Sequence, residues 1–213
     1  MTTTAEHREV AAATRRAKTL RKLVTAVEGL IGEGEDYTAL SVERIIGRAD
    51  VARSTFYAHY DGKGPLLRAV GESVISRVID SSRGWSGLAD DAGRPELREA
   101  MAQIVRTYRE HAALMGAMAE VSAYDAEVRQ AFGRIITLSQ AELTAHARQG
   151  QQTGAVRADI DPAVTVRWLT WMVERCCHQL VGPARDTDLE AHVDALTGIV
   201  WSSLYEGAPT RPR

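Results

Sequence analysis

The chain has 213 residues, a formal net charge of −2 and 45% hydrophobic residues, which suits one large globular domain or a small domain joined to a larger one. It contains no run of 18 apolar residues and no apolar N-terminal segment of the signal-peptide kind, which argues against a membrane-spanning or secreted protein. The two cysteines, Cys176 and Cys177, are adjacent and unsuited to pairing with each other, so the sequence predicts a cytoplasmic protein in a reducing compartment.

Charge is distributed unevenly along the chain. Residues 1–68 carry 11 lysines and arginines against 9 acidic residues, whereas residues 69–213 carry 15 against 19. All three lysines, Lys18, Lys22 and Lys63, lie in the first part. This asymmetry favours an N-terminal module that binds nucleic acid, attached to an acidic body.

The first clear helical pattern begins near Thr14. Residues 1–13 have little apolar periodicity, and we predict either a flexible arm or an extension of this helix. Apolar residues then recur at helical spacing up to Ile31, and the opposite face carries Arg15, Lys18, Arg21 and Lys22. This basic face is either an ordinary solvated surface or a contact for DNA phosphates near the helix start.

The stretch from Ser41 to Leu67 has the pattern of two short helices, a tight turn and the start of a third helix. Ser41 can cap the first of these helices, and the chain turns at Asp50. The second helix, at 53–59, has an outward set of hydrogen-bonding side chains: Arg53, Ser54, Thr55, Tyr57 and His59. The DNA major groove admits one helix and offers donors and acceptors to such side chains. The pattern therefore predicts a helix-turn-helix in which these residues and Ser41 bind DNA.

The run STFYAHYDGK followed by LL resembles the DNA-binding segment of TetR-family transcriptional regulators, which have a Tyr-x-x-aromatic run and a Lys opening the next helix. The resemblance implies that Tyr57 and Lys63 contact the phosphate backbone, with Lys63 at a helix N-terminus. Two positions depart from the family pattern. Asp50 stands in the turn where Gly is usual, and Ala52 stands where Ser or Thr usually caps the recognition helix. Because Ala cannot cap, we expect a loss of about 1 kcal/mol of helix stability.

The rest of the chain also reads as helices, so the predicted fold is all-α with about nine helices. Gly64-Pro65 begins a fourth helix that stops at 81–84, and a loop around Trp85 follows. Asp161 caps a helix at 161–181, after which a last helix covers 189–205. We predict a three-helix DNA-binding domain at 1–63, a larger helical ligand-binding and dimerisation domain at 64–206, and a flexible tail at 207–213.

The segments TWMVERCCHQ and DALTGIVWSSLYEG resemble those of EthR-like regulators within the same family. The resemblance implies a ligand channel that uses polar residues at the places of Thr170 and Val173, the second of which has lost its amide-type side chain. From their residue types and facing helices, we predict a cavity lined by Met101, Tyr108, Met115, Met118, Phe132, Trp168, Thr170 and Trp171, with Trp85 as a further candidate. For each of them, a place in the ordinary core is an alternative.

The helix at 161–181 is apolar on most sides, and such a helix must be covered all round. The last two helices are therefore expected to form a homodimer. The sequence as a whole predicts a repressor that binds a palindromic operator in double-stranded DNA and is released by a small apolar ligand. The alternative is an architectural DNA-binding protein or activator whose large domain only dimerises. A ligand cavity distinguishes the two.

No pattern in the sequence indicates catalysis or a cofactor. Cys176, Cys177 and His178 are consecutive, and on a helix they point about 100° apart, so they cannot converge on a metal ion or form a nucleophile–base pair. The sequence has no phosphate-binding loop and no zinc-ligand spacing. We therefore predict neither an enzyme nor a metal protein.

Overall fold

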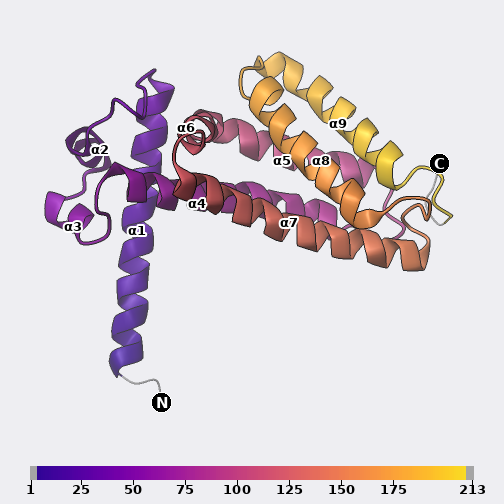
Figure 1. The fold of residues 1–213 in the computed structure, drawn as a ribbon, viewed down its shortest axis with the longest axis horizontal. Coiled ribbons are helices and arrows are strands. Elements are labelled where there is room, and N and C mark those ends of the chain that lie inside the picture. The colour runs from indigo at the N-terminus through magenta and orange to yellow at the C-terminus, as the bar shows by residue number, and fades with distance from the viewer. Residues whose placement is uncertain (1–3, 210–213) are drawn as a thin grey trace.

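The computed structural model describes residues 4–209, and within that range all regular structure is helical, as predicted (Figure 1). The nine α-helices are α1 Thr4–Gly32, α2 Val42–Ala49, α3 Arg53–Tyr57, α4 Lys63–Ser86, α5 Arg94–Glu110, α6 Ala112–Ser122, α7 Ala126–Thr153, α8 Pro162–Cys176 and α9 Leu189–Leu204. A π-helical turn, η1 Cys177–Val181, continues α8, and a short 3-10 turn, η2 Asp186–Asp188, precedes α9.

Helices α1, α2 and α3 form a small unit at one end of the molecule (Figure 1). Leu23, Val27 and Leu30 lie fully buried along one side of α1, against Ile45 of α2. Phe56 is the buried residue of α3 and belongs to the same hydrophobic core. The three helices are held together in this way because each contributes apolar residues to one core.

Helix α1 begins at Thr4 in the described part of the chain, so residues 4–13 form an extension of the helix and not a flexible arm. Residues 1–3 lie outside the described residues. Residues 6–18 of this helix are exposed, and Figure 1 shows α1 projecting away from the rest of the molecule.

The turn between α2 and α3 has the local structure that its residues predict. The Ser41 hydroxyl accepts a hydrogen bond from the Arg44 amide at 3.1 Å and caps α2. Asp50 adopts the left-handed conformation, with φ 49° and ψ 55°, a backbone that Asp tolerates better than most residues. Ala52 is the N-cap of α3 and makes no side-chain cap, so the expected absence of a capping bond is confirmed.

Helix α4 spans the expected domain boundary at residues 63/64. Leu66 and Leu67 are buried near its start. The predicted end at 81–84 is wrong, because α4 continues to Ser86. Trp85 is buried there and donates from Nε1 to the Tyr205 hydroxyl at 2.9 Å, and this tertiary contact outweighs the local helix-breaking signal of Gly84.

Helices α5, α6, α8 and α9 complete a bundle around the long pair α4 and α7. Helices α8 and α9 lie along one outer edge of this bundle (Figure 1). Asp161 caps α8 as predicted, accepting from the Val164 amide at 3.0 Å. The tail turns after α9, with Gly207 at φ 79° and Ala208 buried. The predicted flexible tail therefore has an ordered start, and residues 210–213 lie outside the described part.

Candidate DNA-binding surface and ligand cavity

The recognition-helix residues separate into two faces. Phe56 is fully buried, whereas Arg53, Ser54, Thr55 and Tyr57 are exposed on the outer side of α3. His59 follows the helix, is half-buried and stacks edge-on against Tyr60. The structure therefore leaves four of the five predicted side chains of this segment accessible to a partner.

Tyr57 is held in place by its neighbours. Its ring is 45% exposed, and the Arg53 guanidinium lies 5.2 Å from the ring centroid. Arg53 also forms an ion pair with Glu43 of α2. These contacts orient the tyrosine hydroxyl outward without covering it, which leaves it able to donate to a phosphate.

Lys63 opens α4 at the edge of this surface. Its ammonium donates to the Thr38 carbonyl at 2.7 Å, while the Tyr37 hydroxyl donates to the Lys63 carbonyl at 2.8 Å. Burial raises the pKa of Tyr37, so the phenol remains a neutral donor. These bonds fix the first turn of α4 to the connector before α2 and keep the lysine at a helix N-terminus, where an anion is favoured.

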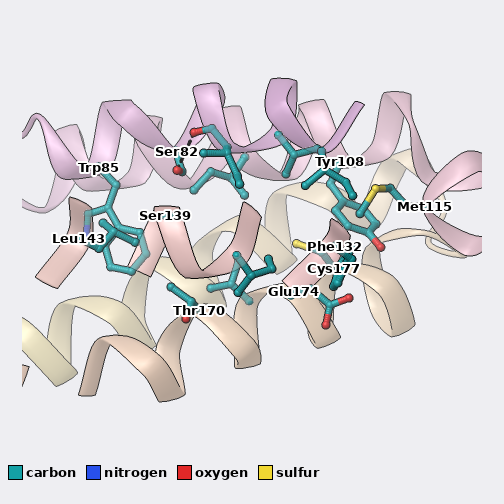
Figure 2. Close-up of a pocket in the computed structure, with 16 residues that line it drawn as sticks. Ser82, Trp85, Tyr108, Met115, Phe132, Ser139, Leu143, Thr170, Glu174 and Cys177 are labelled. Carbon is teal, nitrogen blue, oxygen red and sulfur yellow. Dashed lines mark hydrogen bonds between the residues drawn. The ribbon is translucent and has the colours of Figure 1, made fainter. Parts of the chain in front are cut away.

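The C-terminal domain contains a cavity of about 70 Å³ between α4, α5, α6, α7 and α8 (Figure 2). Its wall is almost entirely apolar. Trp85 and Leu143 lie at one end, and Tyr108, Phe132 and Glu174 lie at the other (Figure 2). The remaining lining residues are Ile75, Val78, Ile79, Ser82, Ile104, Met115, Ile136, Ser139, Thr170, Val173 and Cys177.

Five residues that we predicted to line a cavity do so: Trp85, Tyr108, Met115, Phe132 and Thr170. Met101 and Met118 do not, because they are fully buried in the core, where Met118 packs against Gly71 of α4. The placement of Trp168 and Trp171 at the cavity is wrong. They are 76% and 43% exposed on the outer side of α8, since a residue one or two positions from Thr170 is turned away by 100° or more.

Most polar atoms around the cavity already have partners. Thr170 Oγ1 donates to the Val166 carbonyl at 2.9 Å and accepts from Gln140 Nε2 at 2.8 Å. The Trp85 indole N–H is bonded to Tyr205. Within residues 4–209, the two buried side-chain atoms that lack a hydrogen-bond partner are Tyr108 Oη and Glu174 Oε2, and both residues line the cavity.

The polar end of the cavity is electrostatically unusual. Burial raises the pKa of the Glu174 carboxyl, while the nearby Arg175 and His178 act in the opposite direction. Burial also raises the pKa of Tyr108, and the charge of Glu174 adds to this effect. The pKa of the Cys177 thiol rises to about 12, mainly through burial. Near neutral pH this end therefore holds a carboxyl whose charge is poorly solvated, beside a neutral phenol and a neutral thiol.

The sequence analysis did not identify Glu174. The signal was present, because Glu174 stands four residues after Thr170 and so shares its side of α8. Val173 and Cys177 lie on the same side of the helix and also line the cavity. A glutamate on a helix that is otherwise apolar suggests a surface position, and only the packing of α5 against this region buries its Oε2.

The outer side of α8 and α9 carries a group of exposed apolar side chains, which we call the α8–α9 face: Val164, Trp168, Trp171, Leu180 and Ile199. Monomeric proteins rarely expose large apolar side chains in a contiguous group. Among the described helices, none is both long and apolar enough to cross a membrane.

The fold and the two sites define a helix-turn-helix DNA-binding protein with a separate helical domain that encloses a cavity. The family model described as the C-terminal domain of the transcriptional regulator EthR matches residues 97–206, and that of the bacterial regulatory proteins of the tetR family matches residues 30–70. The chain belongs to the TetR family of transcriptional regulators, with an EthR-like C-terminal domain, and is not an enzyme.

Solved structures share this fold. The regulator PfmR from Thermus thermophilus has a TM-score of 0.64 at 18% identity, covering 84% of this chain and 96% of its own. The fatty acid degradation regulator FadR from Bacillus halodurans has a TM-score of 0.65 at 18% identity, covering 85% and 94%. FadR from Bacillus subtilis in complex with stearoyl-CoA has a TM-score of 0.61 at 18% identity, covering 86% and 98%. Among curated proteins, none matches the chain.

Proposed function

We propose that this regulator is a cytoplasmic repressor that binds a palindromic operator as a homodimer and is released by a small, mainly apolar ligand. The observation that carries the proposal is the position of the cavity. Five residues of its wall, from Ile75 to Trp85, belong to α4, and α4 begins at Lys63 beside the recognition helix. One rigid helix thus connects the ligand cavity with the DNA-binding surface.

The dimer follows from the α8–α9 face. A single recognition helix makes too few base contacts for useful specificity, and twofold symmetry doubles them. Trp168, at 76% exposed, is the most exposed large apolar residue of this face, and pairing of two copies across it would remove it from water. A four-helix arrangement of α8 and α9 from both chains is the expected geometry.

The size of the cavity suggests how a ligand would release the protein from DNA. Its 70 Å³ is well below the roughly 300–1,000 Å³ that drug-sized ligands occupy, so a ligand has to push the walls apart. The two recognition helices of a dimer must be about 34–36 Å apart along the groove, and a shift of a few Å at α4 abolishes simultaneous contact. A 100-fold release requires that the ligand prefer the non-binding form by about 2.7 kcal/mol.

The chemistry of a related structure is compatible with an apolar ligand. FadR from Bacillus subtilis, which shares the fold at 18% identity, was solved with stearoyl-CoA, a molecule with a long hydrocarbon chain. The long cavity of this chain, with Trp85 at one end and Phe132 near the other, would suit an elongated ligand (Figure 2). The small free volume favours the second candidate function, a DNA-binding protein or activator whose large domain only dimerises.

The experiment is operator selection from random duplex DNA, followed by fluorescence anisotropy over a range of salt concentrations. Tyr57→Ala and Lys63→Ala should weaken binding to all sequences, and Lys63→Ala should also reduce the salt slope by about 1, because it removes a cation that neutralises a phosphate. Ser54→Ala or Thr55→Ala should instead change the preferred sequence. Arg83→Ala, at the far end of α4, is the matched control and should leave binding unchanged. Undiminished affinity in both Tyr57→Ala and Lys63→Ala would refute the proposed surface.

A further inference from the structure

The cavity has one polar end, and this end determines which ligands suit it. Tyr108 comes from α5 and Glu174 from α8, so two helices direct a hydrogen-bonding group toward the same part of the cavity (Figure 2). Tyr108 is 2% exposed. Its Oη and the Glu174 Oε2 are both fully buried and unpartnered within the described residues, and the two side chains are not hydrogen-bonded to each other. A carboxylate oxygen that accepts and a phenol that can donate or accept are therefore available for a third group.

Leaving such atoms unpartnered is energetically unfavourable. A buried polar group without a hydrogen bond destabilises a fold, and an unpaired carboxylate does so more strongly. The unpaired atoms persist at the one place where a cavity adjoins them, while the other polar atoms of the wall, on Thr170 and Trp85, have found partners. This arrangement is typical of a binding site whose partner group arrives with the ligand.

The charge of that partner follows from Glu174. A ligand carboxylate would meet a protein carboxylate in a poorly solvated site, where like charges repel strongly. A hydroxyl could donate to Glu174 and accept from Tyr108, but it carries no positive charge to offset the charge of the carboxylate. A protonated amine has several N–H donors and a positive charge, so it can donate to Oε2 of Glu174 and to Oη of Tyr108 together. The neighbouring cationic side chain, Arg175, is exposed to solvent and leaves this place in the cavity free for a ligand.

We propose that the cavity binds an elongated apolar molecule that ends in a protonated amine, with the ammonium group between Glu174 and Tyr108 and the hydrocarbon part directed toward Trp85. This inference rests on the proposed ligand-binding function of the domain and specifies the chemical class of the ligand. Thr170, the other polar residue expected at the cavity, already has partners for its hydroxyl.

The test uses the full-length protein and three probes of equal chain length: octylamine, octan-1-ol and octanoate. Isothermal calorimetry measures binding, and anisotropy with operator DNA measures release independently. Octylamine should bind about 10- to 100-fold more tightly than octan-1-ol, which is the effect of one charge-assisted hydrogen bond. Octanoate should bind more weakly than both.

Two variants test whether Glu174 and Tyr108 cause the preference for octylamine. Glu174→Gln keeps the shape of the side chain and removes its charge, so octylamine should lose most of its advantage while octan-1-ol binds as before. Tyr108→Phe should weaken octylamine by a smaller factor. Ser139→Ala, a change in a polar wall residue of α7, is the matched control and should leave the order of the three probes unchanged. Thermal unfolding of each variant shows that it is folded.

The outcomes separate the inference from the function on which it rests. Equal or tighter binding of octan-1-ol or octanoate by the folded wild-type protein overturns the inference, as does an amine preference that survives in Glu174→Gln. If none of the three probes binds at millimolar concentration, the inference is also overturned. Selective binding of octylamine without any loss of DNA affinity supports the amine site and contradicts the ligand-released repressor. If a probe releases the DNA and Glu174→Gln does not change this release, the ligand-released repressor is supported and the amine site is contradicted.

Discussion

Glu28 of α1 and His111, which precedes α6, are joined side chain to side chain, with 2.5 Å between Oε1 and Nδ1. His111 is 8% exposed, and the residues around it belong to the C-terminal domain. Met115, one turn further along, lines the cavity. This contact therefore connects the DNA-binding domain with the cavity wall by a second route besides α4.

Replacing Glu28 with Ala should destabilise the protein by about 1–3 kcal/mol, because a buried imidazole then loses its partner. Urea unfolding measures the change. Glu9→Ala, which removes an exposed glutamate from the same helix, is the control and should unfold at the wild-type midpoint. If both variants lose equal stability, the effect belongs to the helix and not to the contact between the domains.

Gly71 of α4 lies directly against the side chain of Met118 in α6. A Cβ built on it would lie 2.2 Å from Cε of Met118. Gly71→Ala should therefore displace the methionine and cost about 1–3 kcal/mol through overpacking, measured by thermal unfolding. The double variant Gly71→Ala with Met118→Ala should lose less stability than the sum of the two single variants, because the shortened side chain makes room for the added methyl group. A single variant as stable as the wild type would show that Met118 moves aside freely.

Ala52 offers a test of the recognition helix itself. It occupies the N-cap of α3 with φ −64° and ψ 142°, a backbone that a capping serine adopts, yet it provides no side-chain oxygen. Ala52→Ser should raise stability by about 1 kcal/mol. Ala58→Ser, at the other end of α3, has no amide to cap and is the control. A neutral result at position 52 would mean that water already satisfies the first amides of this helix.

The α8–α9 face predicts the oligomeric state. Trp168→Glu should convert the dimer into a monomer and lower DNA affinity, because a charge inside an apolar interface has no partner. Light scattering after size-exclusion chromatography measures the mass. Leu138→Glu, at a position of α7 that is 65% exposed, changes an apolar side chain elsewhere on the surface and should leave the dimer intact. A Trp168→Glu variant that remains dimeric would place the interface elsewhere.

Glu174 should make stability depend on pH in the absence of a ligand. Burial raises its pKa in the folded protein above the ordinary 4.5, so the folded state holds the proton more tightly than the unfolded chain does. The favourable contribution of the protonated carboxyl is complete below pH 4.5 and is lost as the pH rises through the folded pKa. Relative to Glu174→Gln, the wild type should therefore become less stable from acidic toward neutral pH, as thermal unfolding at several pH values would show. A constant difference would mean that solvent reaches this carboxylate.

Local chemistry in the sequence determined most of the helices. Ser41 and Asp161 mark helix starts because a capping side chain bonds to amides only two or three residues away, and Asp50 marks the turn because its own backbone preference suffices. The exposed residues of α3 were also predictable from the residues of that segment alone. Phe56 is the one strongly apolar residue among polar neighbours, so only one orientation of the helix buries it.

Tertiary structure alone decided how α8 is oriented. Its sequence is apolar on most sides, so periodicity could not tell the side that faces the cavity from the side that faces a partner. The packing of α7 against α8 places Thr170 and Glu174 at the cavity and leaves Trp168 exposed, the reverse of what hydrophobicity alone suggests for a tryptophan and a glutamate. The sequence determined where most of the helices begin, because capping and periodicity act over a few residues, whereas the end of α4 depended on the contact of Trp85 with Tyr205. The identity of the cavity wall depends on contacts between residues far apart in the chain, which no local pattern encodes.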